Sequence, residues 1–120
     1  MRIQLKRIYD APQEEDGFRV LSERLWPRGI SKEKARIDEW IKDLAPSPEL
    51  RRWYAHDEGK WPEFQARYRA ELDTSDELEP WIQSLQAHRT VTLVYASKGE
   101  KTSSVVLRQV VHERLASPES

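Results

Sequence analysis

The chain has 120 residues and a mass of 14.2 kDa, with 38% hydrophobic residues, 34% charged residues and a formal net charge of −1. This length fills one hydrophobic core and not two, and the near-neutral charge excludes a protein that coats nucleic acid through its overall field. The chain has no cysteine, which excludes thiolate nucleophiles, disulfides and cysteine metal sites and favours a reducing, cytoplasmic location.

Membrane insertion is not expected. No apolar run reaches the roughly 18 residues that a membrane-spanning helix needs, and the first residues lack the apolar core of a secretory signal.

The first 26 residues predict two strands. Residues 2–9 alternate between apolar and charged side chains, which is typical of a half-buried strand. Residues 10–17 form a polar turn, and residues 18–26 predict a second strand that Pro27 and Gly29 end. A helix is the alternative for residues 18–26.

A helix is predicted between Ser31, a suitable N-cap, and Pro46, which ends it. Its apolar face follows the helical spacing at Ile37, Trp40, Ile41 and Leu44.

Three more helices follow from the same kind of pattern. Ser47 and Pro48 supply a cap and a first helical residue for a short helix. A long apolar stripe follows at Trp61, Phe64, Tyr68 and Leu72. Another stripe lies at Leu78, Trp81, Ile82 and Leu85, and Pro80 restricts how early that helix begins.

The last third of the chain predicts a buried strand and a final helix. Residues 91–95 are a continuous apolar and β-branched run, which is typical of a strand in a parallel sheet. A loop over 98–104 then leads to a helix whose buried side carries Leu107, Val110, Val111 and Leu115. We therefore expect a single small α/β domain over residues 1–116, with a mainly parallel sheet of three or four strands flanked by helices, and a frayed tail over 117–120.

Two cationic loops are expected to form a binding crevice. In open parallel sheets, ligands bind beyond the carboxyl ends of the strands. The loops 23–29 and 97–104 leave two predicted strands, so their arginine and lysine side chains can meet near the start of the last helix, where backbone N–H groups favour anions. The residues expected to bind the ligand are Arg7, Arg19, Arg24, Trp26, Arg28, Lys98 and Ser103.

The ligand expected at this crevice is a phosphate-bearing molecule, either a nucleotide or a nucleic acid, with Trp26 available for stacking. The alternative is a purely structural role, in which Arg24 pairs with Glu23 or Asp10 and Trp26 packs in the core. Because the loop 98–104 lacks the GxxxxGK[ST] pattern, it is not a phosphate loop of the Walker type.

Two other functions stay open. One is an enzyme that acts on a phosphorylated substrate, with His56, next to Asp57, or Asp10 as the acid–base residue. The other is a protein–protein interaction module with Trp26 and Arg28 as anchors. The histidines and acidic residues show no metal-ligand spacing, and no cofactor is predicted.

Several short motifs resemble a bacterial family, domain of unknown function 488, in its short YeaO-like branch. They are Leu5–Asp10, Asp16–Arg19, Arg24–Gly29, Leu44–Ser47, Arg52–Trp53 and His56–Asp57. The resemblance covers nearly the whole chain and implies a small α/β domain, without an established activity, substrate or cofactor. Similar proteins carry a His-Asn or Asn-His pair before the final helix, where this chain reads Lys101–Ser104.

Overall fold

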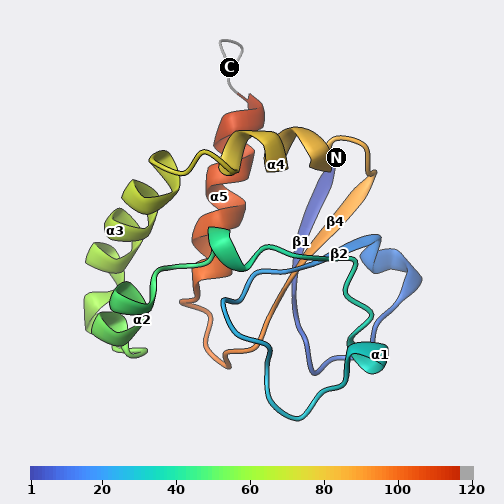
Figure 1. Ribbon diagram of the computed structural model, residues 1–120, viewed down its shortest axis with the longest axis horizontal. Helices are drawn as coiled ribbons and strands as arrows, with labels where there is room; N and C mark the ends of the chain where they lie inside the picture. Colours follow the sequence, from blue (N-terminus) through green and yellow to red (C-terminus); the bar gives the residue numbers. More distant parts are fainter. Residues whose placement is uncertain (117–120) are drawn as a thin grey trace.

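The computed structural model describes residues 1–116 and places four strands in one parallel sheet (Figure 1). The strands are β1 (Arg2–Arg7), β2 (Phe18–Leu21), β3 (Glu39–Trp40) and β4 (Thr90–Tyr95), in the spatial order β1-β4-β2-β3. All neighbours are parallel, with Leu5 opposite Leu93 and Val20 opposite both Leu93 and Glu39. The predicted parallel α/β sheet is therefore confirmed.

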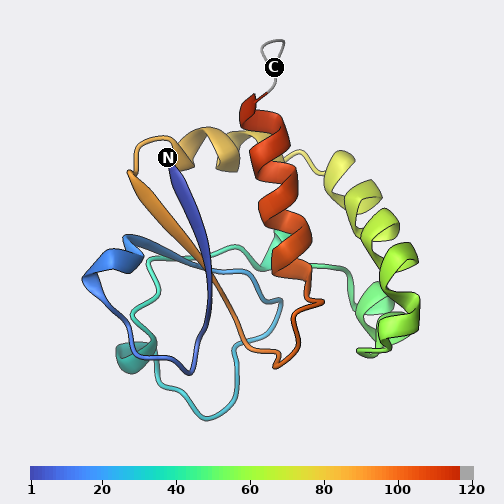
Figure 2. The same cartoon turned by 180° about the vertical axis from the view of Figure 1, so that it is seen from behind.

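The longer helices cover one face of the sheet. They are α2 (Pro48–Tyr54), α3 (Trp61–Asp73), α4 (Leu78–Leu85) and α5 (Ser103–Ala116). Both views show α3 and α5 side by side, with α4 crossing near the amino-terminal end of β1 (Figures 1 and 2). These helices bury the predicted stripes in the main core, including Phe64, Tyr68, Leu72, Leu78, Trp81, Leu107 and Val111.

The predicted boundaries of these helices are close to those observed. Ser47 caps α2 by accepting a hydrogen bond from the Leu50 N–H, and Pro48 is the first helical residue. In α4, Pro80 lies in the first turn, where the missing N–H costs no intrahelical hydrogen bond. The predicted tail, residues 117–120, lies outside the described residues.

The predicted helix from Ser31 to Pro46 is wrong. Only α1 (Lys32–Ala35) is helical, and Arg36 ends it with left-handed φ and ψ values of 49° and 48°. The chain then extends into β3. Two hydrogen bonds hold it there: the Asp38 N–H donates to the Arg19 carbonyl, and the Asp38 carboxylate accepts from the Arg19 N–H. A short 3-10 turn, η2 (Lys42–Leu44), follows.

The apolar residues of this segment are divided between two cores, which explains the misleading pattern. Ile37 and Trp40 pack in a second core on the other face of the sheet, whereas Ile41 and Leu44 belong to the main core. The second core is completed by Ile8, Leu21, Trp26, Ile30, Ala35, Val94 and Ala96.

The second strand is shorter than predicted. β2 ends at Leu21, and after Ser22 the chain leaves the sheet in a loop that returns Trp26 to the second core. Before β2, the 3-10 turn η1 (Glu14–Asp16) leads into Gly17, whose φ is +64°. A Cβ at position 17 would lie 2.3 Å from the Thr90 carbonyl oxygen, so only glycine fits there.

No helix within residues 1–116 is long and apolar enough to cross a membrane.

Candidate functional site

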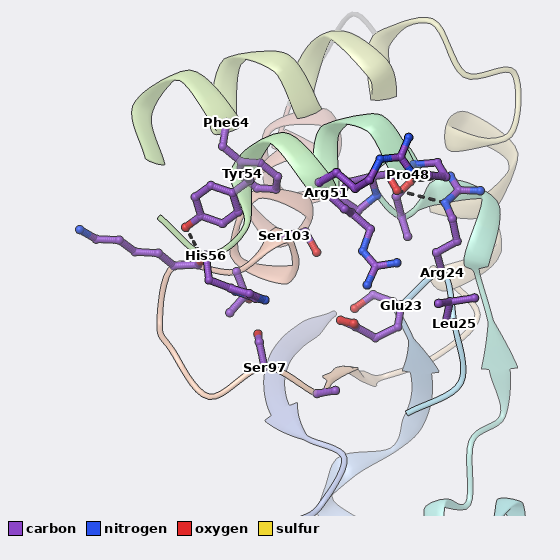
Figure 3. A pocket seen from close by; sticks show the side chains of 17 residues that line it. Glu23, Arg24, Leu25, Pro48, Arg51, Tyr54, His56, Phe64, Ser97 and Ser103 are labelled. Carbon is purple, nitrogen blue, oxygen red and sulfur yellow. Dashed lines mark hydrogen bonds between the residues drawn. The ribbon is translucent and has the colours of Figure 1, made fainter. Parts of the chain in front are cut away.

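A cavity of about 590 Å³ opens beyond the carboxyl ends of β2 and β4, beside the starts of α2 and α5 (Figure 3). We call it the strand-end cavity. Its walls are formed by Ser22–Leu25, Ala45, Pro46, Pro48, Arg51, Arg52, Tyr54, His56, Phe64, Ala96, Ser97 and Lys101–Ser103. It lies at the edge of the sheet where the sequence predicts a crevice.

Arg24 reaches from the β2 exit to the segment before α2. Its Nε donates to the Pro46 carbonyl at 3.1 Å and its Nη2 donates to the Ala45 carbonyl at 3.1 Å. Within residues 1–116 no carboxylate forms an ion pair with Arg24. Because carbonyl groups hold a guanidinium without cancelling its charge, Arg24 keeps a net positive charge in the cavity wall. This arrangement differs from the alternative in which Glu23 or Asp10 neutralises Arg24.

Arg51 adds a second guanidinium from α2. In Figure 3 its side chain extends across the cavity toward Glu23. Arg51 is exposed, and it too has no ion-pair partner within the described residues. With Arg52, three guanidiniums therefore border the same space, and none of them forms an ion pair within the described residues.

The start of α5 forms another wall. The N–H groups at the start of a 14-residue helix such as α5 give this end of the helix a partial positive charge, and of these the Val105 N–H donates to the Thr102 carbonyl at 3.1 Å. Ser103 points its hydroxyl toward the cavity in Figure 3. The adjacent Thr102 is only 6% exposed, and its Oγ1 has no hydrogen-bond partner among residues 1–116.

A buried hydroxyl pair fixes this helix end against β2. Ser22 and Ser104 are both buried, with their Oγ atoms 2.7 Å apart, and Ser22 Oγ also donates to the Val94 carbonyl. The first turn of α5 is therefore held in place against the exits of β2 and β4.

Glu23 places a carboxylate in this cationic setting. Burial raises the pKa of Glu23, while the positive charge of Arg51 and a hydrogen bond with the Ala96 backbone oppose that rise. The Glu23 carbonyl accepts a hydrogen bond from Trp40 Nε1 at 2.6 Å, which fixes its backbone. The site therefore combines three guanidiniums and the Lys101 ammonium with one partly buried acid.

Tyr54 and His56 form the aromatic side of the cavity. The Tyr54 ring stacks on Phe64 with centroids 4.2 Å apart, and its hydroxyl donates to the Lys101 carbonyl at 2.9 Å. Burial, followed by the charges of Glu58 and Asp57, raises the pKa of the Tyr54 hydroxyl. His56 has a left-handed φ of +58° and is exposed at the rim. His56 and Arg24 border one cavity, as the enzyme alternative requires.

Lys98 borders a smaller hollow of about 370 Å³. This hollow shares Tyr54, His56, Ser97 and Lys101 with the strand-end cavity. Lys98 is therefore near the cavity without forming its wall.

Arg19 and Arg7 have structural roles. Arg19 is 3% exposed, its Nη1 lies 2.6 Å from the Asp16 carboxylate, and its Nε and Nη2 both donate to the Ala35 carbonyl. Arg7 donates to the carbonyls of Ala96 and Ser97, so it positions the loop after β4. Neither residue lines the strand-end cavity.

Trp26, Arg28 and Asp10 also lie outside the cavity wall. Trp26 packs edge-on against Trp40 in the second core, and its Nε1 donates to the Ile30 carbonyl at 2.8 Å. The Trp26 ring is partly buried by this packing and does not face the strand-end cavity. Arg28 and Asp10 are exposed and do not border the cavity. Of the predicted ligand-binding residues, the structure brings Arg24 and Ser103 together.

No pattern in the sequence led us to predict Glu23, Arg51 or Thr102 as binding residues. Glu23 had a usable signal, because it belongs to the loop 23–29 that leaves a parallel strand. Arg51 lies on the polar side of a short helix and could not be distinguished from a solvated surface arginine. Within residues 1–116, no group of three or more histidine, aspartate or glutamate side chains could hold a metal ion.

Comparison with known proteins gives a match over residues 2–120 to the family described as the inactive DUF488-N3 subclade. A protein of Mycobacterium tuberculosis is 39% identical over 114 residues, covering 94% of this chain and 96% of the relative. The protein YeaO of Escherichia coli is 38% identical over 98 residues, covering 82% of this chain and 85% of the relative. Both relatives are described as uncharacterized. No solved structure matches the chain.

Proposed function

The chain belongs to the inactive DUF488-N3 subclade, and we propose that within this family it binds a phosphate-bearing ligand, such as a nucleotide, in the strand-end cavity. One observation carries the proposal: Arg24, Arg51 and the first turn of α5 border the same space, and the buried Thr102 hydroxyl beside that turn has no partner within residues 1–116. Phosphate oxygens accept hydrogen bonds from free guanidinium N–H groups and from the N–H groups at the start of a helix.

The electrostatics support an anion over a neutral ligand. A guanidinium binds an oxyanion most strongly when two of its N–H groups donate in parallel. In Arg24, the Nε and Nη2 donors are already occupied by backbone carbonyls. Arg24 thus contributes a fixed charge, while Arg51, which reaches across the cavity, supplies N–H groups that a phosphate can use. Because Arg51 is exposed, its attraction for the ligand weakens with added salt.

Catalysis is the second candidate. His56 borders the cavity, so a histidine is available next to a bound phosphate ester for proton transfer. The description of the family as inactive favours binding over catalysis. The lack of cysteine is compatible with a protein that works in the reducing cytoplasm.

The proposal is tested by titrating inorganic phosphate into the protein by isothermal titration calorimetry at low ionic strength. We expect saturable binding, and we expect Arg51→Ala to weaken it about tenfold, the effect of losing one charge-assisted hydrogen bond. Arg28→Ala is the matched control, because it removes the same charge from an exposed residue outside the cavity wall.

If both variants weakened phosphate binding equally, the loss would come from the change in net charge, which would contradict a site at the cavity. An absence of phosphate binding by the unmodified protein at low salt would also overturn the proposal.

A further inference from the structure

Glu23 is an unexpected residue for a site that binds only a bare anion. Its carboxylate faces the strand-end cavity, beneath the guanidinium of Arg51 in Figure 3. A carboxylate accepts hydrogen bonds and donates none when it is ionised, so next to a phosphate it contributes repulsion. A ligand that consisted of phosphate alone would bind better without it.

The carboxylate has acceptor capacity that the described residues do not fill. A backbone hydrogen bond at Ala96 and the charge of Arg51 act on it, yet no ion pair joins Glu23 to a cationic group anywhere in residues 1–116. Each carboxylate oxygen accepts two hydrogen bonds, so several remain for a donor on the ligand.

The size and lining of the cavity indicate that the phosphate carries an organic group. The volume of about 590 Å³ lies within the range of about 300–1,000 Å³ that is usual for small organic ligands. Leu25, Pro46 and Phe64 contribute apolar wall on which a sugar or a base can pack.

The position of Glu23 next to Arg51 indicates which part of the ligand contacts its carboxylate. Arg51, which we assign to the phosphate, is the cation whose charge acts on the Glu23 carboxylate. In Figure 3 the Glu23 carboxylate lies beneath the Arg51 guanidinium, so a ligand whose phosphate contacts Arg51 presents the group next to that phosphate to Glu23. In a nucleotide the ribose occupies that position, and its hydroxyls are donors that an acidic side chain accepts in other nucleotide sites.

We propose that Glu23 accepts a hydrogen bond from the ribose 2′-hydroxyl and so selects ribonucleotides over free phosphate and over 2′-deoxyribonucleotides, an inference that rests on the phosphate binding proposed above. Glu23 is thus the residue that determines specificity, and Arg51 and the start of α5 bind the phosphate.

The test compares adenosine 5′-monophosphate, its 2′-deoxy analogue and inorganic phosphate on the unmodified protein and on Glu23→Gln. On the unmodified protein we expect the ribonucleotide to bind about tenfold more tightly than the deoxyribonucleotide, the effect of one hydrogen bond to a charged group. In Glu23→Gln this ratio falls to about twofold, while phosphate binds more tightly because the repelling charge is gone.

Glu49→Gln is the matched control, since it makes the same change at an exposed residue of α2 outside the cavity wall and should leave all three affinities unchanged. Equal affinities for the two nucleotides on the unmodified protein would overturn the assignment of Glu23, even if the variant failed to fold. A ratio that Glu23→Gln leaves intact would overturn it as well. Failure of all three ligands to bind would instead reject the phosphate site itself.

Discussion

Basic residues lie at both ends of β2, but only those at one end form ion pairs with a carboxylate. At the amino-terminal end, Arg19 and Lys6 both contact the buried carboxylate of Asp16, at 2.6 and 3.1 Å. Beyond the carboxyl-terminal end, Arg24 and Arg51 border a cavity without a paired carboxylate among residues 1–116. The cations of the first cluster form direct ion pairs within the protein and stabilise the fold. In the second region Glu23 lies beside Arg51 without forming an ion pair, so the guanidiniums stay available to a ligand.

The largest expected effect is at the amino-terminal end of β2, where the cations are ion-paired. In Asp16→Asn, Arg19 stays buried with its charge unpaired, and the variant should lose about 3 kcal/mol of unfolding free energy. Urea denaturation followed by tryptophan fluorescence measures this loss. A loss below about 0.5 kcal/mol, the size of an ordinary surface substitution, would contradict the structural role of the cluster.

The same carboxylate makes stability depend on pH. Burial alone would raise the pKa of Asp16, but hydrogen bonds from the Gln13 backbone, Lys6 and Arg19 outweigh burial and hold the pKa below its ordinary value of 3.8. The unfolded chain therefore takes up the proton first on acidification. The contribution of Asp16 is fully present above the ordinary pKa and is lost as the pH falls through the lower, folded value. Asp16→Asn should lack this component of acid denaturation.

A smaller loss is expected from Arg24, which combines both roles. Arg24→Ala removes two hydrogen bonds to the carbonyls of Ala45 and Pro46 and should cost about 2 kcal/mol in the same assay. Arg24→Lys restores the charge but not the fork of donors, so it should recover phosphate affinity more than stability. If Arg24→Lys recovered stability but not phosphate affinity, Arg24 would have only a structural role, as Arg19 does.

The smallest effect has the opposite sign. Thr102→Val keeps the shape of the side chain and removes a buried hydroxyl that has no partner in the described part of the chain. We expect a gain of about 1 kcal/mol in unfolding free energy together with weaker phosphate binding. A clear loss of stability would mean that the hydroxyl is satisfied in the unliganded protein, which would remove one reason to expect a ligand beside it.

The sequence predicts the elements whose apolar residues serve one core. The stripe from Trp61 to Leu72 meets the main core along its length, so its helical spacing leads to a correct helix, α3. The segment from Ile37 to Leu44 has similar spacing, but its residues divide between two faces of the sheet, and hydrogen bonds to Arg19 decide its conformation. Contacts between distant residues override the local pattern there.

The site, like the fold, is predicted only in part, because contacts between residues distant in the sequence decide which side chains form it. The position beyond the parallel strands follows from topology, which is why Arg24 and Ser103 were selected. Whether an arginine is neutralised depends on its partners in space, and the sequence does not distinguish buried Arg19 from Arg24. Arg51 reaches the cavity from a helix that the local pattern describes only as amphipathic.

The most direct test of the difference between the two ends of β2 is a titration of the ¹⁵N-labelled protein with inorganic phosphate, followed through its backbone amide resonances. We expect saturable shifts at Ser103, Ser104 and Val105, in the first turn of α5, and little change at Asp16 and Arg19. Shifts centred on the loop around Arg28, or none at all, would contradict it.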